Sequence, residues 1–184
     1  MTERRARAVI DRRVAVVLLV DAQGRILMQH RDAHAKTSPN QWAFPGGRIE
    51  AGEEPVDAAR RELEEELGLT LPPSSLLGQL DDYPTRSGYV ITPFAFWGGA
   101  DPVLTPDPDE VLSVHRIAFR ELCRPDSPRF VAIPESDRPV VQLPIGGDLI
   151  HAPTGAVLLQ FRRVAIEGVG ERVAGYEQPV FAWR

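Results

Sequence analysis

The chain has 184 residues, of which 43% are hydrophobic and 26% charged, and its formal net charge is −5. This length suits one domain with a sizeable core, and the negative charge argues against long DNA or RNA as a partner. A single cysteine, Cys123, excludes an intrachain disulfide, and no stretch approaches the ~20 apolar residues that span a bilayer.

The first predicted elements are two strands joined by a turn. Residues 13–20 are rich in Val and Leu and predict a buried strand, residues 21–24 have turn chemistry, and residues 25–31 predict the returning strand. The basic N-terminus leads straight into the first strand and lacks the long apolar region and cleavage site of a signal peptide, so a cytoplasmic protein is expected. Residues 32–43 are predicted to be a polar loop.

A long helix is the next predicted element. Phe44-Pro45-Gly46-Gly47 begins a loop that can hold unusual backbone angles. Pro55 suits the first position of the helix and Gly68 suits its end. Strands are then expected at 76–80, 89–97 and 111–117, with a loop over 98–109.

The C-terminal part of the chain predicts a smaller set of elements. Residues 124–139 are Pro-rich and are expected to be irregular, and residues 140–150 predict a hairpin that turns at Gly146-Gly147. A second helix is predicted over 154–168 and a last strand over 179–183. The sequence therefore predicts one mixed α/β domain over 1–184, with its core at about 15–180.

Three glutamates on the first helix carry the chemical signal. Successive helical residues turn by ~100°, so Glu62, Glu65 and Glu66 share one face. A neighbouring apolar stripe can pack against a sheet; its members are Val56, Ala59, Leu63 and Leu67. Converging carboxylates repel one another, and a hard cation such as Mg²⁺ or Mn²⁺ would offset that repulsion.

An acidic run on a helix is more often a solvated face, so the surrounding residues decide between the two interpretations. The segment 47–69 has Gly47, five residues, Glu53, seven residues, Arg61-Glu62-Leu63, one residue, Glu65-Glu66, one residue and Gly68-Leu69. This spacing resembles the Nudix box at every defining position. The chain is therefore identified as resembling the Nudix hydrolases over about 15–180.

The resemblance implies a fold, a reaction and a set of roles. The fold would be an α/β/α sandwich with a mixed sheet, and the substrate would be a nucleoside diphosphate linked to another group. Glu62, Glu65 and Glu66 would be the metal ligands, with the backbone carbonyl of Gly47 as a further one. Glu53 would shape the box, and Arg61 would hold Glu53 or a neighbouring carboxylate.

The general base has three candidates. A carboxylate must take a proton from the attacking water, and Glu65 or Glu66 could do so. In many Nudix enzymes the base comes from a later loop, where Glu110 is the candidate. The alternative for Glu110 is a solvated residue at the start of a strand.

The substrate is less well defined by the sequence. A partial resemblance to coenzyme A diphosphatases rests on Leu27, Arg31 and residues 44–47, which fall at matching spacing. Five positions depart from that longer motif: Met28, Gln29, Asp32, Lys36 and Asn40. Coenzyme A or a derivative is one expected substrate; ADP-ribose, a sugar nucleotide or an oxidised nucleotide is the alternative.

Contacts to the substrate are predicted at a few positions near the box. Arg31, Lys36 and Arg48 are phosphate contacts or merely exposed basic residues, and Trp42 stacks on a base or packs in the fold. Tyr83, Arg86 and Tyr89 line a nucleotide pocket or, as favoured, are strand and turn residues.

The expected partner is a small nucleotide diphosphate, with no long nucleic acid and no membrane. The sequence does not set the oligomeric state, and the family resemblance is compatible with a homodimer. A non-catalytic nucleotide sensor is the alternative of another functional class.

Overall fold

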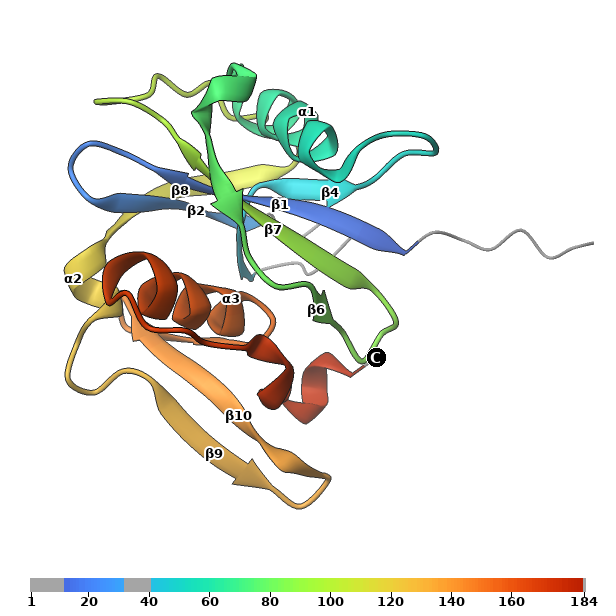
Figure 1. The fold of residues 1–184 in the computed structure, drawn as a ribbon, viewed down its shortest axis with the longest axis vertical. Coiled ribbons are helices and arrows are strands. Elements are labelled where there is room, and N and C mark those ends of the chain that lie inside the picture. The colour runs from blue at the N-terminus through green and yellow to red at the C-terminus, as the bar shows by residue number, and fades with distance from the viewer. Residues whose placement is uncertain (1–11, 32–40, 184) are drawn as a thin grey trace, which may run out of the picture.

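The computed structural model describes residues 12–31 and 41–183, with the side chain of Arg31 outside the description. Figure 1 shows helix α1 (Pro55–Leu67) on one face of a central sheet and helix α3 (Thr154–Phe161) on the other, with a second sheet packed on the far side of α3. This arrangement confirms the expected α/β fold with a mixed sheet.

The central sheet combines parallel and antiparallel pairs. Its strands are β1 (Arg13–Val20), β2 (Arg25–Arg31), β3 (Trp42–Ala43), β4 (Gly46–Arg48), β5 (Leu76–Gln79), β6 (Tyr83–Pro84), β7 (Val90–Trp97) and β8 (Val111–Ala118). The main order is β3-β2-β1-β7-β5, while β4 pairs with β1, β6 with β7 and β8 with β2. Strands β1 and β7 are parallel along their whole length, and the other pairs are antiparallel.

The C-terminal elements form the second sheet and its covering helix. The sheet has the order β11-β10-β9, with β9 (Arg129–Ile133), β10 (Ser136–Ile145) and β11 (Asp148–His151). The short helix α2 (Phe119–Leu122) precedes it, and a π-helical turn, Arg162–Ile166, continues α3. Single 3₁₀ turns occur at Pro73–Ser75, Val173–Gly175 and Val180–Ala182.

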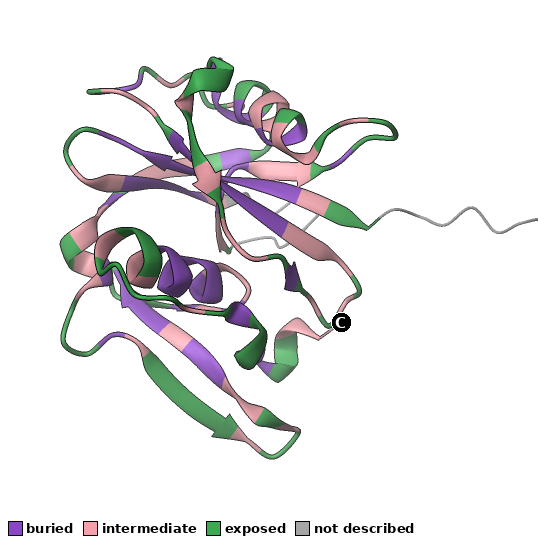
Figure 2. Cartoon of the chain, in the orientation of Figure 1, coloured by how far each residue is buried: buried purple, intermediate pink, exposed green. Residues whose placement is uncertain are grey.

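Strand β1 separates two apolar cores. Its side chains alternate between the two faces of the sheet, as the period of a strand requires. Val17 packs on the side of α1 with Leu63 and Leu67, whereas Leu18 packs on the other side with Leu158. Both faces of β1 are covered, so its central residues are buried, as the purple strands in the middle of Figure 2 show.

Helix α1 begins and ends where the sequence predicts. Pro55 occupies the first turn, and Gly68 terminates the helix in a left-handed conformation with φ of 64°, donating its N–H to the carbonyl of Glu64. Val56, Ala59, Leu63 and Leu67 pack in the core on this side, while Glu64 is exposed. The helix therefore presents its remaining face, with the other glutamates, to β4 and solvent.

Several predicted elements in the C-terminal third were wrong. The segment expected to be irregular, 124–139, contains β9 and the start of β10, and β10 accommodates Pro139 where its register with β9 shifts. Strand β9 is an exposed edge strand, so it lacks the alternation that burial imposes. Residues 180–182 form a 3₁₀ turn instead of a strand, and the α-helical part of 154–168 ends at Phe161.

None of the helices in the described ranges 12–31 and 41–183 is long and apolar enough to cross a membrane.

Candidate active site

The site is built where α1 crosses β4. The backbone of three consecutive residues of β4, Gly46 to Arg48, contacts side chains of α1. The N–H of Gly46 donates to Oε2 of Glu66 at 3.0 Å, and the backbone of Gly47 lies against the Glu62 carboxylate. Arg61 donates from Nη2 to the carbonyl of Arg48 at 3.0 Å. All three residues of β4 are thus held against α1.

Glycine is required at Gly46 by the neighbouring backbone, and at Gly47 it allows the Glu62 carboxylate to lie close to the strand. A methyl group on Gly46 would lie 2.3 Å from the carbonyl oxygen of Ala15, and the φ of Gly46 is 149°. A methyl group on Gly47 would lie 2.3 Å from Oε2 of Glu62. Both approaches are far inside van der Waals contact, so the two glycines let strand and carboxylate come together.

Arg61 gathers three of the carboxylates. Its guanidinium forms a bidentate pair with Glu53: Nε donates to Oε1 at 2.9 Å and Nη2 donates to Oε2 at 3.1 Å. Its Nη1 reaches Oε1 of Glu62 at 2.8 Å and Oε2 of Glu65 at 3.0 Å. The hydrogen bond from Arg61 lowers the pKa of Glu53, and the carboxylate of Glu53 in turn raises the pKa of Arg61.

The three helical glutamates differ strongly in exposure. Glu66 is 2% exposed, Glu62 is 15% exposed and Glu65 is 59% exposed. Glu66 takes two hydrogen bonds on Oε2, one from Gly46 and one from Nε2 of Gln29 at 2.9 Å. Glu66 is therefore the most rigidly held of the three, and Glu65 the one most open to solvent.

Glu62 is influenced by one arginine and by two other carboxylates. Burial raises its pKa, the neighbouring Arg61 opposes that rise, and the charges of Glu65 and Glu110 add to it. This coupling places Glu110 within electrostatic reach of the helix, although the two residues are far apart in the chain. A cation at this position would offset the repulsion.

The loop that carries Glu110 is pinned to the C-terminal end of α1. The N–H of Thr105 donates to the carbonyl of Leu67 at 2.8 Å, and the N–H of Asp107 donates to the carbonyl of Glu66 at 2.9 Å. Val111 and Glu110 then close a turn by donating to the carbonyl of Asp107. These bonds satisfy free carbonyls of the helix terminus and fix the position of Glu110, which directly precedes β8.

The donor set suits a hard cation, because it consists of carboxylate and carbonyl oxygens. The close approach of Gly47 to Glu62 also brings the box backbone to the carboxylates. In the part of the chain that the structure describes, however, no three His, Cys, Asp or Glu side chains form a ready-made metal cage. Arg61 spans Glu62 and Glu65 instead, so the metal ligands stay a prediction.

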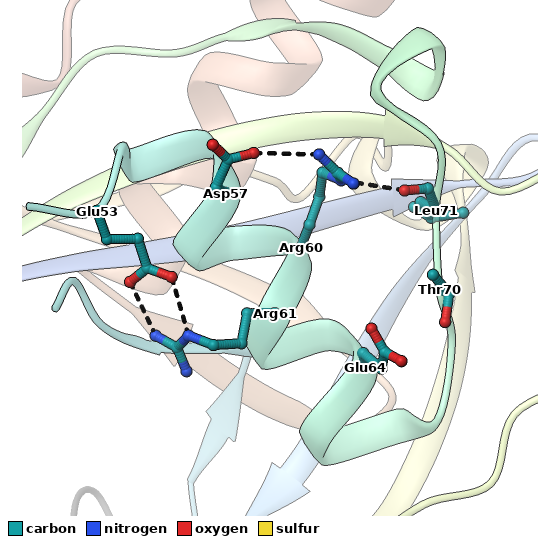
Figure 3. Close-up of a pocket in the computed structure, with 7 residues that line it drawn as sticks. All are labelled: Glu53, Asp57, Arg60, Arg61, Glu64, Thr70 and Leu71. Carbon is teal, nitrogen blue, oxygen red and sulfur yellow. Dashed lines mark hydrogen bonds and ion pairs between the residues drawn. The ribbon is translucent and has the colours of Figure 1, made fainter.

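A shallow polar hollow of about 260 Å³ lies beside α1 (Figure 3). Its lining residues are Glu53, Asp57, Arg60, Arg61, Glu64, Thr70 and Leu71. Within this lining, Arg60 donates to the carbonyl of Leu71 at 3.0 Å and to Asp57 at 3.1 Å. The hollow shares Glu53 and Arg61 with the carboxylate cluster, but Glu62, Glu65 and Glu66 do not line it.

The predicted substrate contacts fall in different places. Arg48 donates from Nη2 to the hydroxyl of Tyr89 at 2.8 Å. The indole of Trp42 packs on His115, with ring centroids 4.5 Å apart, and its Nε1 donates to Asp148 at 2.7 Å. The side chain of Arg31 and the whole of Lys36 lie outside the described residues.

Gln29 is the site residue that sequence reasoning missed. In the sequence, Gln29 stands out only as a departure from the coenzyme A diphosphatase motif. In the structure it is fully buried and hydrogen-bonded to Glu66. A polar residue directly after the apolar run Ile26 to Met28 was the available signal. Such a residue on a buried strand needs a hydrogen-bonding partner.

Known proteins resemble parts of this chain. An m7GpppN-mRNA hydrolase of Danio rerio is 41% identical over 64 residues, which are 35% of this chain and 21% of the relative. The 8-oxo-dGTP diphosphatase of Escherichia coli is 39% identical over 74 residues, which are 40% of this chain and 57% of the relative. An isopentenyl-diphosphate Delta-isomerase of Streptomyces griseus is 34% identical over 139 residues, covering 68% of this chain and 69% of the relative. The chain spans between a fifth and about a half of the first curated relatives it matches.

Solved structures show the same fold. A Nudix hydrolase of M. smegmatis, RenU, matches with a TM-score of 0.55 at 19% identity, covering 88% of this chain and 89% of that one. A bifunctional NMN adenylyltransferase/ADP ribose pyrophosphatase of Francisella tularensis, complexed with AMP and a Mn ion, matches with a TM-score of 0.50 at 26% identity, covering 59% of this chain and 34% of that one. The family model of the NUDIX domain matches residues 10–139, well over half of the chain, which contain α1 and all strands of the central sheet. The chain therefore belongs to the Nudix domain family.

Proposed function

We propose that this protein hydrolyses the diphosphate linkage of a compound in which a nucleoside diphosphate is joined to another group, with the help of a divalent metal ion. One observation carries the proposal: Arg61 gathers Glu53, Glu62 and Glu65 beside the glycine backbone that also holds Glu66. A purely structural role would leave the mutual repulsion of these carboxylates as a cost.

The metal would be Mg²⁺ or Mn²⁺, held by Glu62, Glu65, Glu66 and the carbonyl of Gly47. All of these ligands supply oxygen, which both ions prefer. The structure that contains AMP and a Mn ion in a related protein supports the same class of ion. When bound, the ion shields the negative diphosphate and makes a coordinated water more acidic.

The reaction transfers one water molecule to the diphosphate. The water oxygen attacks one phosphorus, the bond from that phosphorus to the bridging oxygen breaks, and the other phosphate leaves. A carboxylate takes the proton of the attacking water. Glu65 and Glu110 are the better candidates for this base, because Glu66 is buried and already accepts two hydrogen bonds.

The substrate is proposed at the level of a class. Relatives named as an 8-oxo-dGTP diphosphatase and an m7GpppN-mRNA hydrolase support nucleotides with linked phosphates. Coenzyme A or a derivative is the individual compound favoured by the motif around Leu27, Arg31 and residues 44–47. ADP-ribose, sugar nucleotides and oxidised nucleotides are the alternatives.

A second candidate function is isomerisation of a diphosphate ester. One observation favours it: the isopentenyl-diphosphate Delta-isomerase relative matches across 139 residues. A nucleotide sensor without turnover is the candidate of another class; the retention of Glu53, Glu62, Glu65 and Glu66 in one cluster speaks against it.

The test is a substrate panel with product identification by mass. It contains coenzyme A, ADP-ribose, a sugar nucleotide, a dinucleoside polyphosphate, 8-oxo-dGTP and isopentenyl diphosphate, each with Mg²⁺ and with Mn²⁺. We expect one nucleotide to be cleaved with a kcat/KM of about 10⁴ M⁻¹s⁻¹ or more. An isomer of unchanged mass would support the isomerase, and tight binding without product would support the sensor.

Variants separate the roles of the carboxylates. Glu65→Gln, Glu66→Gln and Glu110→Gln are compared with Glu64→Gln, a matched change at an exposed position of the same helix. Hydrolysis should fall in Glu65→Gln and Glu66→Gln, which lose proposed metal ligands, and in Glu110→Gln if Glu110 is the base. Hydrolysis should persist in Glu64→Gln. Unchanged hydrolysis in Glu66→Gln would contradict the proposed site.

A further inference from the structure

We propose that Arg12, Arg48 and Tyr89 form a binding site for a phosphate group of the substrate that lies outside the cleaved diphosphate. The guanidinium carbons of Arg12 and Arg48 lie 5.8 and 5.7 Å from the centre of the Tyr89 ring. Arg48 also donates from Nη2 to the Tyr89 hydroxyl at 2.8 Å. This inference rests on the proposed function, because it names the substrate class of the same site.

The sheet brings these three residues together from distant parts of the chain. Arg12 precedes β1 and Tyr89 precedes β7, and the parallel register of Arg13 with Val90 sets them side by side. The antiparallel register of Val14 with Arg48 then places the end of β4 at the same edge. The carbonyl of Arg12 accepts the N–H of Val90 at 3.0 Å, and Nη1 of Arg12 donates to the carbonyl of Ser87 at 2.9 Å. These hydrogen bonds fix the backbone of Arg12 and orient its side chain.

Among residues 12–31 and 41–183, the two guanidinium groups have no carboxylate partner, unlike other arginines of this acidic protein. Arg86, Arg124 and Arg163 each form an ion pair with a carboxylate. Within the described residues, neither Arg12 nor Arg48 pairs with a carboxylate. Two positive groups held around one tyrosine ring repel each other, and an anion between them would offset that repulsion. Arginine pairs are well suited to the oxygens of a phosphate.

The position of Arg12 and Arg48 relative to the carboxylates of α1 indicates the class of ligand. Arg48 directly follows Gly47, whose backbone lies against Glu62, and the Arg48 carbonyl accepts a hydrogen bond from Arg61. Its side chain, however, shares a sheet face with Val14, which packs in the core on the side away from α1. A substrate that contacts both groups would extend from the carboxylates, past β4, to Arg12 and Arg48 on the other face of the sheet. A nucleotide with a diphosphate and a separate phosphate monoester on its ribose has this form.

Matched compounds test the inference through turnover. The pairs are coenzyme A with 3′-dephospho-coenzyme A, and NADP⁺ with NAD⁺, all with Mg²⁺. We expect the compound with the additional phosphate to have a kcat/KM about tenfold higher or more in at least one pair, as charge-assisted contacts to phosphate allow. Arg12→Gln should bring this ratio towards one. Arg120→Gln removes the same charge from a side chain of α2 that is 86% exposed, and it should keep the wild-type ratio.

Binding without turnover separates this inference from the proposed hydrolysis. Calorimetric titration of the metal-free protein with 3′,5′-ADP and with 5′-AMP measures the same additional phosphate when no compound is cleaved. We expect 3′,5′-ADP to bind about tenfold more tightly, and Arg12→Gln to abolish the difference. Equal affinities in the wild type would overturn the inference. It would also be overturned if inorganic phosphate bound to Arg12 while both members of each pair were cleaved equally, since the site would then serve a free anion.

Discussion

The amide of Gln29 donates from Nε2 to Oε2 of Glu66 at 2.9 Å, inside the protein and across the gap between β2 and α1. The same oxygen accepts the N–H of Gly46 at 3.0 Å, so Glu66 is held from both the strand and the box loop. The other end of the amide, Oε1 of Gln29, is buried without a hydrogen-bond partner among the described residues. The amide thus holds the carboxylate at a cost to the stability of the fold.

Replacing Gln29 should separate stability from metal binding. In Gln29→Met the hydrogen bond to Glu66 is lost, but so is the unsatisfied acceptor, and the two effects oppose each other. The free energy of unfolding should change by less than about 1 kcal/mol, as measured by urea denaturation. The affinity for Mn²⁺, measured by electron paramagnetic resonance, should fall by about tenfold or more, because groups that orient metal ligands have effects of this size. Gln79→Met, an exposed change on β5, is the control, and an unaltered affinity in Gln29→Met would show that Glu66 does not depend on Gln29.

Arg61 and its neighbour Arg60 offer a matched comparison on one helix. Lysine cannot reproduce the fork that binds Glu53, Glu62 and Glu65 together, so Arg61→Lys should lower kcat/KM by about 10- to 100-fold. Among the residues that the structure describes, Arg60→Lys loses contacts only to Asp57 and the carbonyl of Leu71. It should change kcat/KM by less than about threefold, within the range of ordinary surface effects. Equal losses in the two variants would mean that the gathering of carboxylates is irrelevant to turnover.

A methyl group at Gly47 should displace a carboxylate. Gly47→Ala places a carbon 2.3 to 2.5 Å from three atoms of the Glu62 carboxyl group, so Glu62 must move. Because these atoms are the far end of a flexible side chain, Glu62 can shift at little cost, and we expect a loss of less than about 1 kcal/mol in the free energy of unfolding, together with a fall in kcat/KM. Gly78→Ala on β5 meets nothing within 4 Å and serves as the control for both measurements. If Gly47→Ala had the same kcat/KM as Gly78→Ala, the close approach of β4 to the Glu62 carboxylate would not matter for turnover.

The buried carboxylate of Glu177 predicts a pH dependence of stability. Glu177 is 1% exposed and accepts hydrogen bonds from Arg86, Ser136 and Arg138. Foremost the hydrogen bond from Arg86 lowers the pKa of Glu177 from 4.5 to about 2. A depressed pKa means that the folded protein binds the proton more weakly than the unfolded chain, so the stabilisation is present above 4.5 and is lost as pH falls towards 2.

Glu177→Gln should therefore destabilise the protein at neutral pH and matter progressively less in acid. We expect a loss of about 2–4 kcal/mol at pH 7, somewhat below the usual range for a broken buried pair because the arginines are partly exposed. Urea denaturation at pH 7, 5 and 3 measures the difference from the wild type. A difference that stays constant with pH would show that the ionised form of Glu177 is not the stabilising one.

Elements with a strong local pattern were predictable. Strands β1 and β2 match their predicted ranges, because an apolar run between turn residues has few alternatives. Helix α1 could be bounded by Pro55 and Gly68, since both act through their own backbone conformations. Strand β9 could not be predicted, because an exposed edge strand has no buried face to impose alternation.

The sequence by itself determined that Glu62, Glu65 and Glu66 share one face of a helix, that Glu53 and Arg61 stand at Nudix spacing, and that a glycine-rich turn precedes them. These properties follow from helical geometry and backbone chemistry over short distances along the chain. Only the tertiary structure decided that Gln29 holds Glu66, that the loop of Glu110 is pinned to the end of α1, and that Arg12 and Arg48 meet at Tyr89. Each of these contacts joins segments far apart in sequence, and it depends on strand register and on which face of the sheet a side chain occupies, which packing of the whole domain sets.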